Sequence, residues 1–251
     1  MRKAVLHLVL LAGLLAGCEE KIADPDPRAA GYDYYPVAIG DFRIYNVTDI
    51  QYRYNVGDTA RFQLQERVDT SFYDQTNTLN YKIVRSIRPD AGSPWVDDSV
   101  FVVAKTNTMV LLTKDNTPHV KLVFPVKAGE SWLGDAYNNN KANSYTPVDG
   151  RRSEYYLSKE SYTYDKVGEP FTIGDKTYPK TLTVVQGTPT ESWIGFDDRQ
   201  EVYAEDIGMV YMRYNRIVYC NQMESSKCEY AIGYKLNGHE RHEILTSYGH
   251  K

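Results

Sequence analysis

Three cysteines carry the most distinctive chemistry in this 251-residue sequence. Cys18 ends an apolar run and follows two small residues, and the chain turns acidic directly after it. Cys220 and Cys228 are separated by a short segment near the C-terminus. In an oxidising compartment such a pair most simply forms a disulfide, whose loop closure would contribute roughly 2–3 kcal/mol. The alternatives are two free thiols, or a metal pair that lacks further Cys or His ligands at suitable spacing.

Candidates for catalysis are few. The closest histidines, His239 and His242, are three positions apart, whereas the zinc-protease pattern separates its histidines by four positions on a helix. Residues three apart on a strand point to opposite faces, so a solvated strand edge is a simpler interpretation than a metal site. The adjacent acids at 97–98 and 197–198 would diverge on strands or lie in turns.

The sequence also lacks a phosphate loop, a dinucleotide-binding glycine pattern and a serine nucleophile elbow. We therefore expect no catalytic residues, no metal and no cofactor. A glycosidase needs only two carboxylates brought together in space, which leaves no sequence motif, so a hydrolase is the least favoured interpretation and is not excluded.

Tryptophans are the candidates for ligand binding. Trp95 lies beside Pro94, and Trp193 lies near Gly195, in loop-like settings where an indole ring can be exposed and stack against a sugar. Trp132 is more simply a core residue. The alternatives to a glycan are an acyl chain or peptide carried in a β concavity, and an envelope protein that the chain assists in assembly.

The N-terminus has the three parts of an export signal. Arg2 and Lys3 give a positive start, an apolar run follows, and small residues precede the cysteine. Because the apolar run is shorter than the ~20 residues needed to cross a bilayer, residues 1–17 are expected to be a signal peptide rather than a transmembrane helix. Residues 18–33 are polar and rich in proline, which is typical of a tether.

Composition agrees with an exported globular domain. The formal net charge of -4 becomes more negative once the basic start is removed, which gives no electrostatic reason to bind nucleic acid. Residues 34–251 are long enough to bury a large core, and one β-rich domain accounts for them. The polar segment at 138–144 is the best interior boundary, between halves at 34–137 and 145–251.

Period-two alternation predicts an all-β fold with minor helix. In the strand expected at 61–73, the apolar residues share one parity: Phe62, Leu64, Val68 and Phe72. Further strands are expected at 42–54, 79–87, 99–105, 109–113, 120–124, 181–185 and 209–219, and beside the cysteine pair at 214–219 and 230–234. The pair Gly174–Asp175 predicts a two-residue hairpin. One-sided alternation indicates antiparallel pairing, in a curved sheet or half-barrel or in a β-sandwich.

The segment LAGC at residues 15–18 resembles a bacterial lipobox in both spacing and position. The resemblance implies that Cys18 is acylated and becomes the first residue of a mature chain tethered to a membrane; the alternative is an ordinary secretory signal with a chance cysteine. More than one acyl chain makes such anchoring stable.

Three segments extend the resemblance over most of the mature chain: YYPV at 34–37 with Gly40, LVFPVKAGESW at 122–132, and VYAEDIGMV at 202–210. Together with the lipobox they resemble uncharacterised lipoproteins of Bacteroidota, a group with no assigned activity. That resemblance implies an outer-membrane lipoprotein on the periplasmic or cell-surface face, with a non-catalytic binding or assembly role. Thr59 and Ser99 lie in triplets that resemble the O-glycosylation motif of exported proteins in that phylum.

Overall fold

The computed structural model describes residues 28–138, 141–145, 152–156, 160–221, 228–230 and 233–251. Its strands are β1 (Asp41–Arg53), β2 (Val56–Tyr73), β3 (Leu79–Arg88), β4 (Val96–Lys105), β5 (Met109–Lys114), β6 (Thr117–Val123), β7 (Ser131–Leu133), β8 (Lys141–Tyr145), β9 (Arg152–Tyr156), β10 (Ser161–Ile173), β11 (Lys176–Gln186), β12 (Thr190–Glu191), β13 (Gly195–Ala204), β14 (Gly208–Tyr219) and β15 (Lys235–His250). One turn of 3₁₀ helix, η2 (Tyr32–Tyr34), precedes β1. In this part of the chain there is no helix with the length and hydropathy that a membrane crossing requires.

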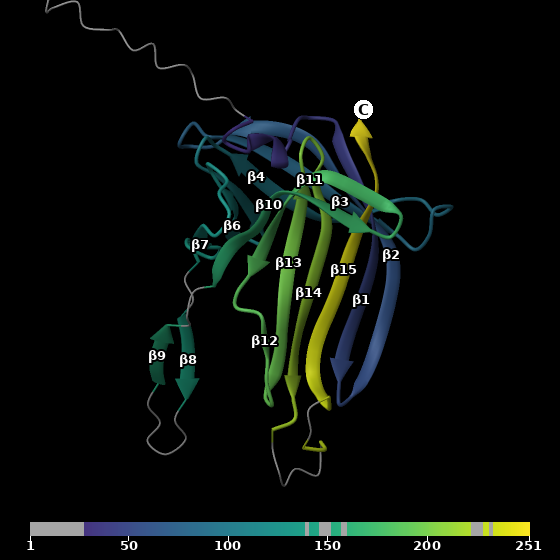
Figure 1. Cartoon of the computed structure of the whole chain (residues 1–251), viewed down its shortest axis with the longest axis vertical. Helices are drawn as coiled ribbons and strands as arrows, with labels where there is room; N and C mark the ends of the chain where they lie inside the picture. Colours follow the sequence, from purple (N-terminus) through teal and green to yellow (C-terminus); the bar gives the residue numbers. More distant parts are fainter. Residues whose placement is uncertain (1–27, 139–140, 146–151, 157–159, 222–227, 231–232) are drawn as a thin grey trace, which may run out of the picture.

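Antiparallel pairing joins the strands into one strongly curved sheet in the order β6-β5-β4-β3-β2-β1-β15-β14-β13-β11-β10-β7, with β12 paired to β13 (Figure 1). The first and last strands of the chain, β1 and β15, are neighbours in it. The two ends of the sheet meet, because the Val120 backbone N–H donates to the Gly134 carbonyl at 2.7 Å and Trp132 Nε1 donates to the Val120 carbonyl at 2.9 Å. The all-β prediction is confirmed, and of its alternatives the curved sheet is observed, rolled into a nearly closed barrel.

Alternation along β2 explains how one face becomes the interior. Leu64 and Val68 are buried, and Phe62 packs against the cluster that contains Leu64, so all three face inward as their shared parity predicts. Phe72, expected on that face, is 44% exposed. The pairing of β2 with β3 shifts register between Val68 and Thr70, and such a bulge reverses the faces of the residues beyond it.

An apolar cluster fills the end of the barrel beside η2, where the tyrosine Tyr164 joins the two ends of the sheet. Its hydroxyl donates to the Val123 carbonyl at 2.7 Å and accepts from the Val123 N–H at 2.8 Å. The Trp132 ring lies 4.5 Å from the Tyr164 ring, so Trp132 packs against the core as expected. The two ends of the sheet are therefore joined by aromatic packing and a tyrosine hydroxyl as well as by backbone hydrogen bonds.

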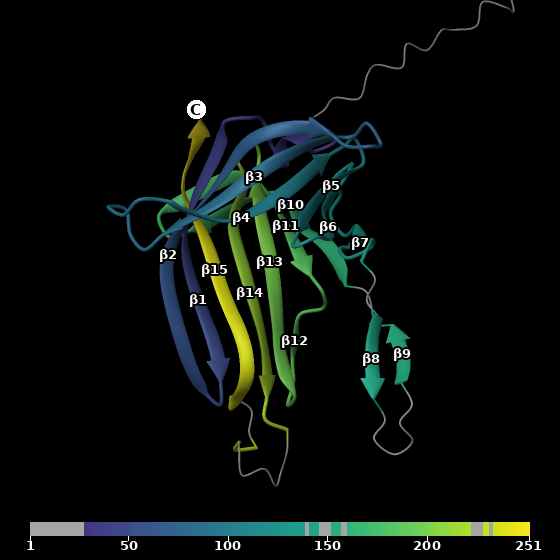
Figure 2. The same ribbon diagram turned by 180° about the vertical axis from the view of Figure 1, so that it is seen from behind.

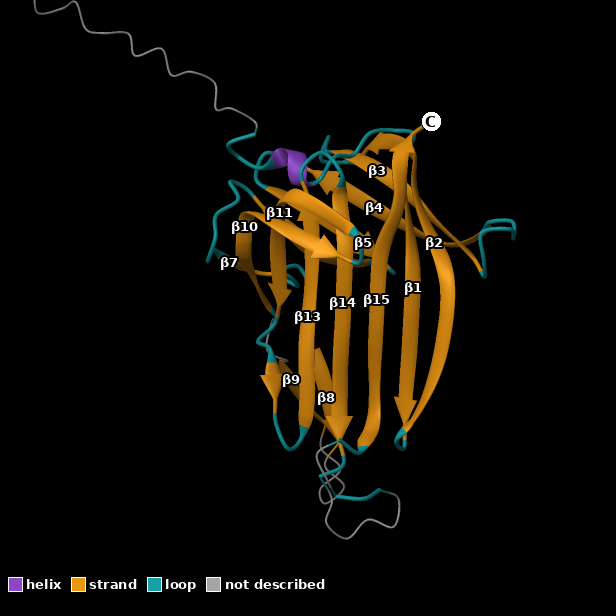
Figure 3. Cartoon of the chain, turned by 45° about the vertical axis from the view of Figure 1, so that its right-hand side comes forward, coloured by secondary structure: helices purple, strands orange, loops and turns teal. Residues whose placement is uncertain are grey.

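The β10–β11 hairpin forms a partial second layer over β13, β14 and β15 (Figure 3). Its turn is the predicted pair Gly174–Asp175, with Gly174 at φ 59° and Ile173 opposite Lys176. Phe171 stacks on Tyr211 with ring centroids 5.6 Å apart, and Lys176 donates to a backbone carbonyl of β15. The hairpin thereby covers apolar residues on the outer face of the sheet.

Other connections refine the expected boundaries. Part of the polar segment at 138–144 belongs to β8, which pairs with β9 in a separate two-stranded sheet beside the barrel (Figure 2). The strand expected at 230–234 begins later, at Lys235. Within the expected tether, Tyr32 packs edge-on against Phe124 at 4.8 Å. Residues 1–17 and Cys18 lie outside the described residues.

Candidate functional site

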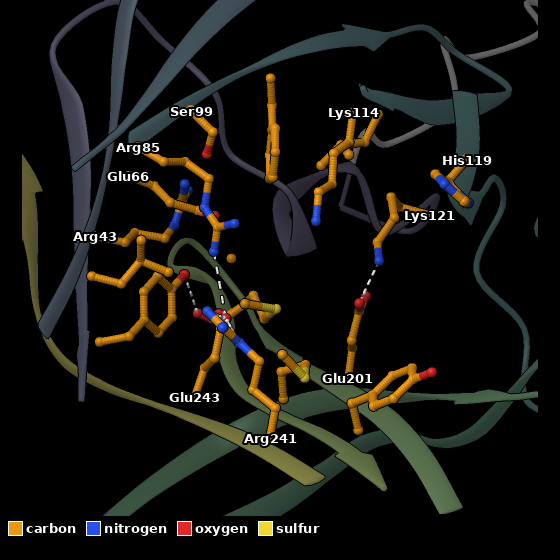
Figure 4. A pocket seen from close by; sticks show the side chains of 18 of the residues that line it. Arg43, Glu66, Arg85, Ser99, Lys114, His119, Lys121, Glu201, Arg241 and Glu243 are labelled. Carbon is orange, nitrogen blue, oxygen red and sulfur yellow. Dashed lines mark hydrogen bonds and ion pairs between the residues drawn. The ribbon is translucent and has the colours of Figure 1, made fainter. Parts of the chain in front are cut away.

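A cavity of about 690 Å³ lies inside the barrel, and charged side chains line it (Figure 4). The cationic ones are Arg43, Arg85, Lys114, Lys121 and Arg241. The anionic ones are Glu66, Asp98, Asp115, Glu201 and Glu243. They come from β1–β6 and the turn between β5 and β6 on one wall, and from β13 and β15 on the other. Because a buried charge is costly unless paired, the geometry of these groups decides what the cavity can hold.

Arg85 connects the two walls of the cavity. Its Nε lies 3.2 Å from Glu66 on β2, and its Nη2 lies 3.4 Å from Glu243 on β15. Glu243 is almost fully buried and is held in addition by Arg241, whose Nε and Nη2 lie 2.8 and 2.7 Å from it. One network of ion pairs thus ties the consecutive strands β2 and β3 to β15, which is distant in sequence.

Arg43 lies opposite Glu66 in the β1–β2 register and donates to backbone carbonyls. Its Nε donates to Ile207 at 2.6 Å and its Nη2 to Pro36 at 2.7 Å. Burial raises the pKa of Glu66 above its ordinary value, although Arg85 and Arg43 act in the other direction. The interior therefore does not fully compensate the charge of this carboxylate.

Glu201 on β13 occupies the other half of the cavity and is better compensated. It pairs with Lys121 of β6, and its Oε2 accepts from the Tyr203 hydroxyl at 2.5 Å. Burial alone would raise its pKa, but Lys121 and the hydrogen bonds from Tyr203 and Gln186 lower it below the ordinary value. Burial and the neighbouring Lys121 lower the pKa of His119, so its imidazole is neutral near pH 7.

The expected solvated edge at His239 and His242 is wrong, because β15 is an inner strand paired with both β1 and β14. The two rings do lie on opposite faces. His239 lines the cavity and lies 3.1 Å from Asp49, while His242 Nδ1 lies 3.1 Å from the Tyr211 hydroxyl outside. Burial would raise the pKa of Asp49, but hydrogen bonds from Arg241 and His239 lower it.

Aromatic rings complete the lining: Tyr35, Tyr45, Tyr162, Tyr203, Tyr214, Phe62 and Phe101. Tyrosine offers an apolar ring and a hydroxyl that donates or accepts, so it suits ligands with both ring faces and polar edges. The cavity therefore combines flat apolar surface with fixed donors and acceptors, and its lining carries more charged groups than the mostly apolar small-molecule sites of proteins.

The predicted ligand-binding tryptophans lie elsewhere. The Trp95 ring is half-buried under the Arg88 guanidinium, whose carbon lies 4.1 Å from the ring centroid. Trp193 is 64% exposed in the turn between β12 and β13. Neither residue lines the cavity. The structure does not bring these two predicted residues into one site with the charged groups.

The other predicted positions are distributed over the sheet. Thr59 is exposed on β2, and Ser99 is half-buried on β4 where it lines the cavity, so both triplets lie in strands. The adjacent acids of β13 diverge as predicted, with Asp197 bound to Arg199 and Asp198 bound to Arg213.

The second cysteine prediction is confirmed, because Cys220 and Cys228 form a disulfide. It closes the loop that follows β14, and the Cys220 N–H donates to the Tyr234 carbonyl at 3.1 Å just before β15. The ends of two neighbouring sheet strands are thereby held together.

No family model matches the sequence, and no curated protein matches it. Two solved structures are similar to 86% of this chain, and the chain covers 98% of each of them. One is a Bacteroides fragilis protein described as exported, with a YmcC-like fold, at 12% identity and a TM-score of 0.37. The other is a Parabacteroides distasonis protein described as a lipoprotein, at 10% identity and a TM-score of 0.38.

Proposed function

We propose that this protein is a lipid-anchored, non-catalytic binding protein of the bacterial cell envelope, and that its barrel holds a polar small molecule. The observation that carries the proposal is the cavity of about 690 Å³ lined by ion-paired side chains and tyrosine rings. Cavities of about 300–1,000 Å³ hold small organic ligands, so this volume suits a molecule of one or a few rings.

The lining favours a polar ligand over an acyl chain. An acyl chain would remove water from Arg85, Glu66 and their neighbours without replacing the lost hydrogen bonds, which is costly for charged groups. A sugar or similar polyhydroxyl compound would offer hydroxyls to the charges and ring faces to the tyrosines. A saccharide is therefore our preferred ligand class, bound in the cavity rather than at the tryptophans.

A binding comparison tests this proposal. The chain from Glu19, without the expected signal peptide and the lipidated cysteine, would be screened on an array of neutral and acidic saccharides, with palmitate binding measured in parallel. Ser99→Trp places an indole in the cavity from β4, so it should weaken saccharide binding at least tenfold. Trp95→Ala and Trp193→Ala, outside the cavity, should bind as the wild type does.

The outcomes separate the alternatives. If Trp193→Ala abolishes binding while Ser99→Trp retains it, the ligand binds at the exposed turn and the cavity proposal is wrong. Binding of palmitate without any saccharide would identify an acyl carrier instead. Silence of every probe would also reject a saccharide-binding role. Unfolding curves of each variant establish that it is folded.

The anchor rests on the LAGC segment at 15–18. The described chain begins at Arg28, at the end of the barrel that η2 covers, so a lipid on Cys18 would tether that end (Figure 1). Cells grown with radioactive palmitate should label the wild type and not Cys18→Ser. An unlabelled wild type would remove the membrane anchor from the proposal and leave the cavity untouched.

A further inference from the structure

Two cations approach one phenyl ring in the cavity wall. The guanidinium carbon of Arg85 lies 4.6 Å from the centroid of the Phe101 ring, and the Lys114 ammonium lies 5.8 Å from the same centroid. The three residues lie on β3, β4 and β5, which are consecutive neighbours in the sheet. Both cations lie near the same ring, so positive charge is concentrated in this part of the cavity wall.

Arg85 retains hydrogen-bonding capacity in this position. Its contacts with Glu66 and Glu243 use Nε and Nη2, which leaves Nη1 for another acceptor. The Nε atom is buried against Glu66 and is closed to a ligand. An oxyanion beside this guanidinium would therefore be met by Nη1.

Lys114 supplies the second positive charge. It lies at the end of β5 and points into the cavity (Figure 4). In contrast to Lys121, it forms no ion pair with a carboxylate of the described residues, and its ammonium lies near the Phe101 ring. Lys114 is exposed to solvent, as are Asp98 and Asp115 of the same lining, so water screens all three charges and the anion position lies at the solvent-exposed side of the cavity.

Resting on the proposed function, we propose that the ligand carries an anionic group, a carboxylate or a phosphate, that binds between Arg85 and Lys114 while its uncharged body lies against the tyrosines. A hydrogen bond between charged groups contributes more than a neutral one, about 1.5–3 kcal/mol. One such contact corresponds to about a tenfold change in affinity or more. The preferred ligand class is thus an acidic saccharide.

Matched sugars isolate the anionic group. Glucose, glucuronate and glucose 6-phosphate differ at one carbon, and their affinities would be measured by calorimetry at low salt. The wild type should bind glucuronate or glucose 6-phosphate at least tenfold more tightly than glucose, and the stronger of the two identifies carboxylate or phosphate.

Three variants test the position. Lys114→Met should erase the preference for the acidic sugar without changing glucose affinity. Lys166 is an exposed lysine outside the cavity, so Lys166→Met should leave the preference for the acidic sugar unchanged. Asp98→Asn removes a negative charge from the lining and should increase that preference. Arg85 stays unaltered in these tests, because its loss would leave Glu66 and Glu243 uncompensated.

A soak of crystals with selenate gives an independent measurement, because this oxyanion has an anomalous signal. A peak in contact with both Arg85 and Lys114, absent from Lys114→Met crystals, would support the anion position even without a sugar. No peak, together with equal binding of glucose and the acidic sugars, would overturn the inference and leave the proposed function standing. If no sugar of any kind binds, the proposed function fails instead.

Discussion

Strands β13, β14 and β15 present one face to the cavity and the other to the β10–β11 hairpin, with alternate residues going to each. In the register, Glu201, Met212 and Glu243 form a row across the inner face. In the adjacent row of the register, Val202, Tyr211 and Ile244 lie across the outer face, against the hairpin. A single step along the chain therefore exchanges two carboxylates for a hydrophobic cluster.

The difference between these rows separates stability from binding. Apolar burial under the hairpin stabilises the sheet without engaging any cavity group. The inner row contributes little hydrophobic energy, because its charges must be held by Lys121, Arg85 and Arg241. The same polar groups are available to a ligand. We infer that apolar burial under the hairpin supplies enough stability for the inner face of the same strands to carry charged residues.

The largest expected effect lies on the outer face. Tyr211→Ala should lower the free energy of unfolding by about 3–5 kcal/mol, because it removes a buried ring stacked on Phe171 at 5.6 Å. Urea denaturation measures this loss. Tyr214→Ala is the matched control, on the same strand but facing the cavity, half-buried beside His239. Its cost should be about 1 kcal/mol. Equal costs would contradict the division between the two faces.

On the inner face, the pair Glu201 and Lys121 should behave as a unit. Glu201→Gln should cost about 3 kcal/mol at pH 7, because it leaves the Lys121 ammonium buried without its carboxylate. Adding Lys121→Met should recover most of that loss, since both charges are then gone. A double-mutant cycle by chemical denaturation measures the coupling. If the two costs simply add, Glu201 and Lys121 do not stabilise each other and the proposed coupling between them is wrong.

The antiparallel strands, one hairpin and the disulfide follow from local patterns in the sequence. Alternation predicts antiparallel strands, Gly174–Asp175 predicts its hairpin, and the spacing of Cys220 and Cys228 predicts their disulfide. Each of these depends on residues close together in the chain. Phe72 is the exception, because a bulge two to four residues earlier reverses its face and no residue type announces the bulge.

A β concavity was one of the predicted alternatives, but its charged lining was not predicted, because the ion-pair partners are brought together only by the pairing and curvature of the sheet. Arg85 and Glu243 are 158 positions apart in the chain. One signal was nevertheless present: Glu66 has the same parity as Leu64 and Val68, so a charge interrupts an otherwise apolar face of β2. An acid at a core position requires a buried cation, which points to an interior ion pair before the structure is known.

The smallest expected effect is that of Glu66 on the pH dependence of stability, and it runs in the opposite direction to that of Glu201. Burial raises its folded pKa above 4.5, so the folded protein takes up this proton before the unfolded chain does as the pH falls. Its contribution to stability is therefore present below pH 4.5 and is lost as the pH rises through the folded pKa. The contribution of Glu201, whose pKa is lowered, is present above pH 4.5 and is lost as the pH falls through its folded pKa.

Glu66→Gln mimics the protonated side chain at every pH. It should change the stability at pH 7 by about 1 kcal/mol or less, and relative to the wild type it should be more stable at pH 7 than at pH 4. Thermal denaturation of both proteins across this range measures the difference. The same series with Glu201→Gln should show the reverse trend, with the larger penalty at pH 7. If stability changes with pH in the same direction for both variants, the folded protein shifts the pKa values of Glu66 and Glu201 in the same direction. The incomplete compensation of the Glu66 charge would then be wrong.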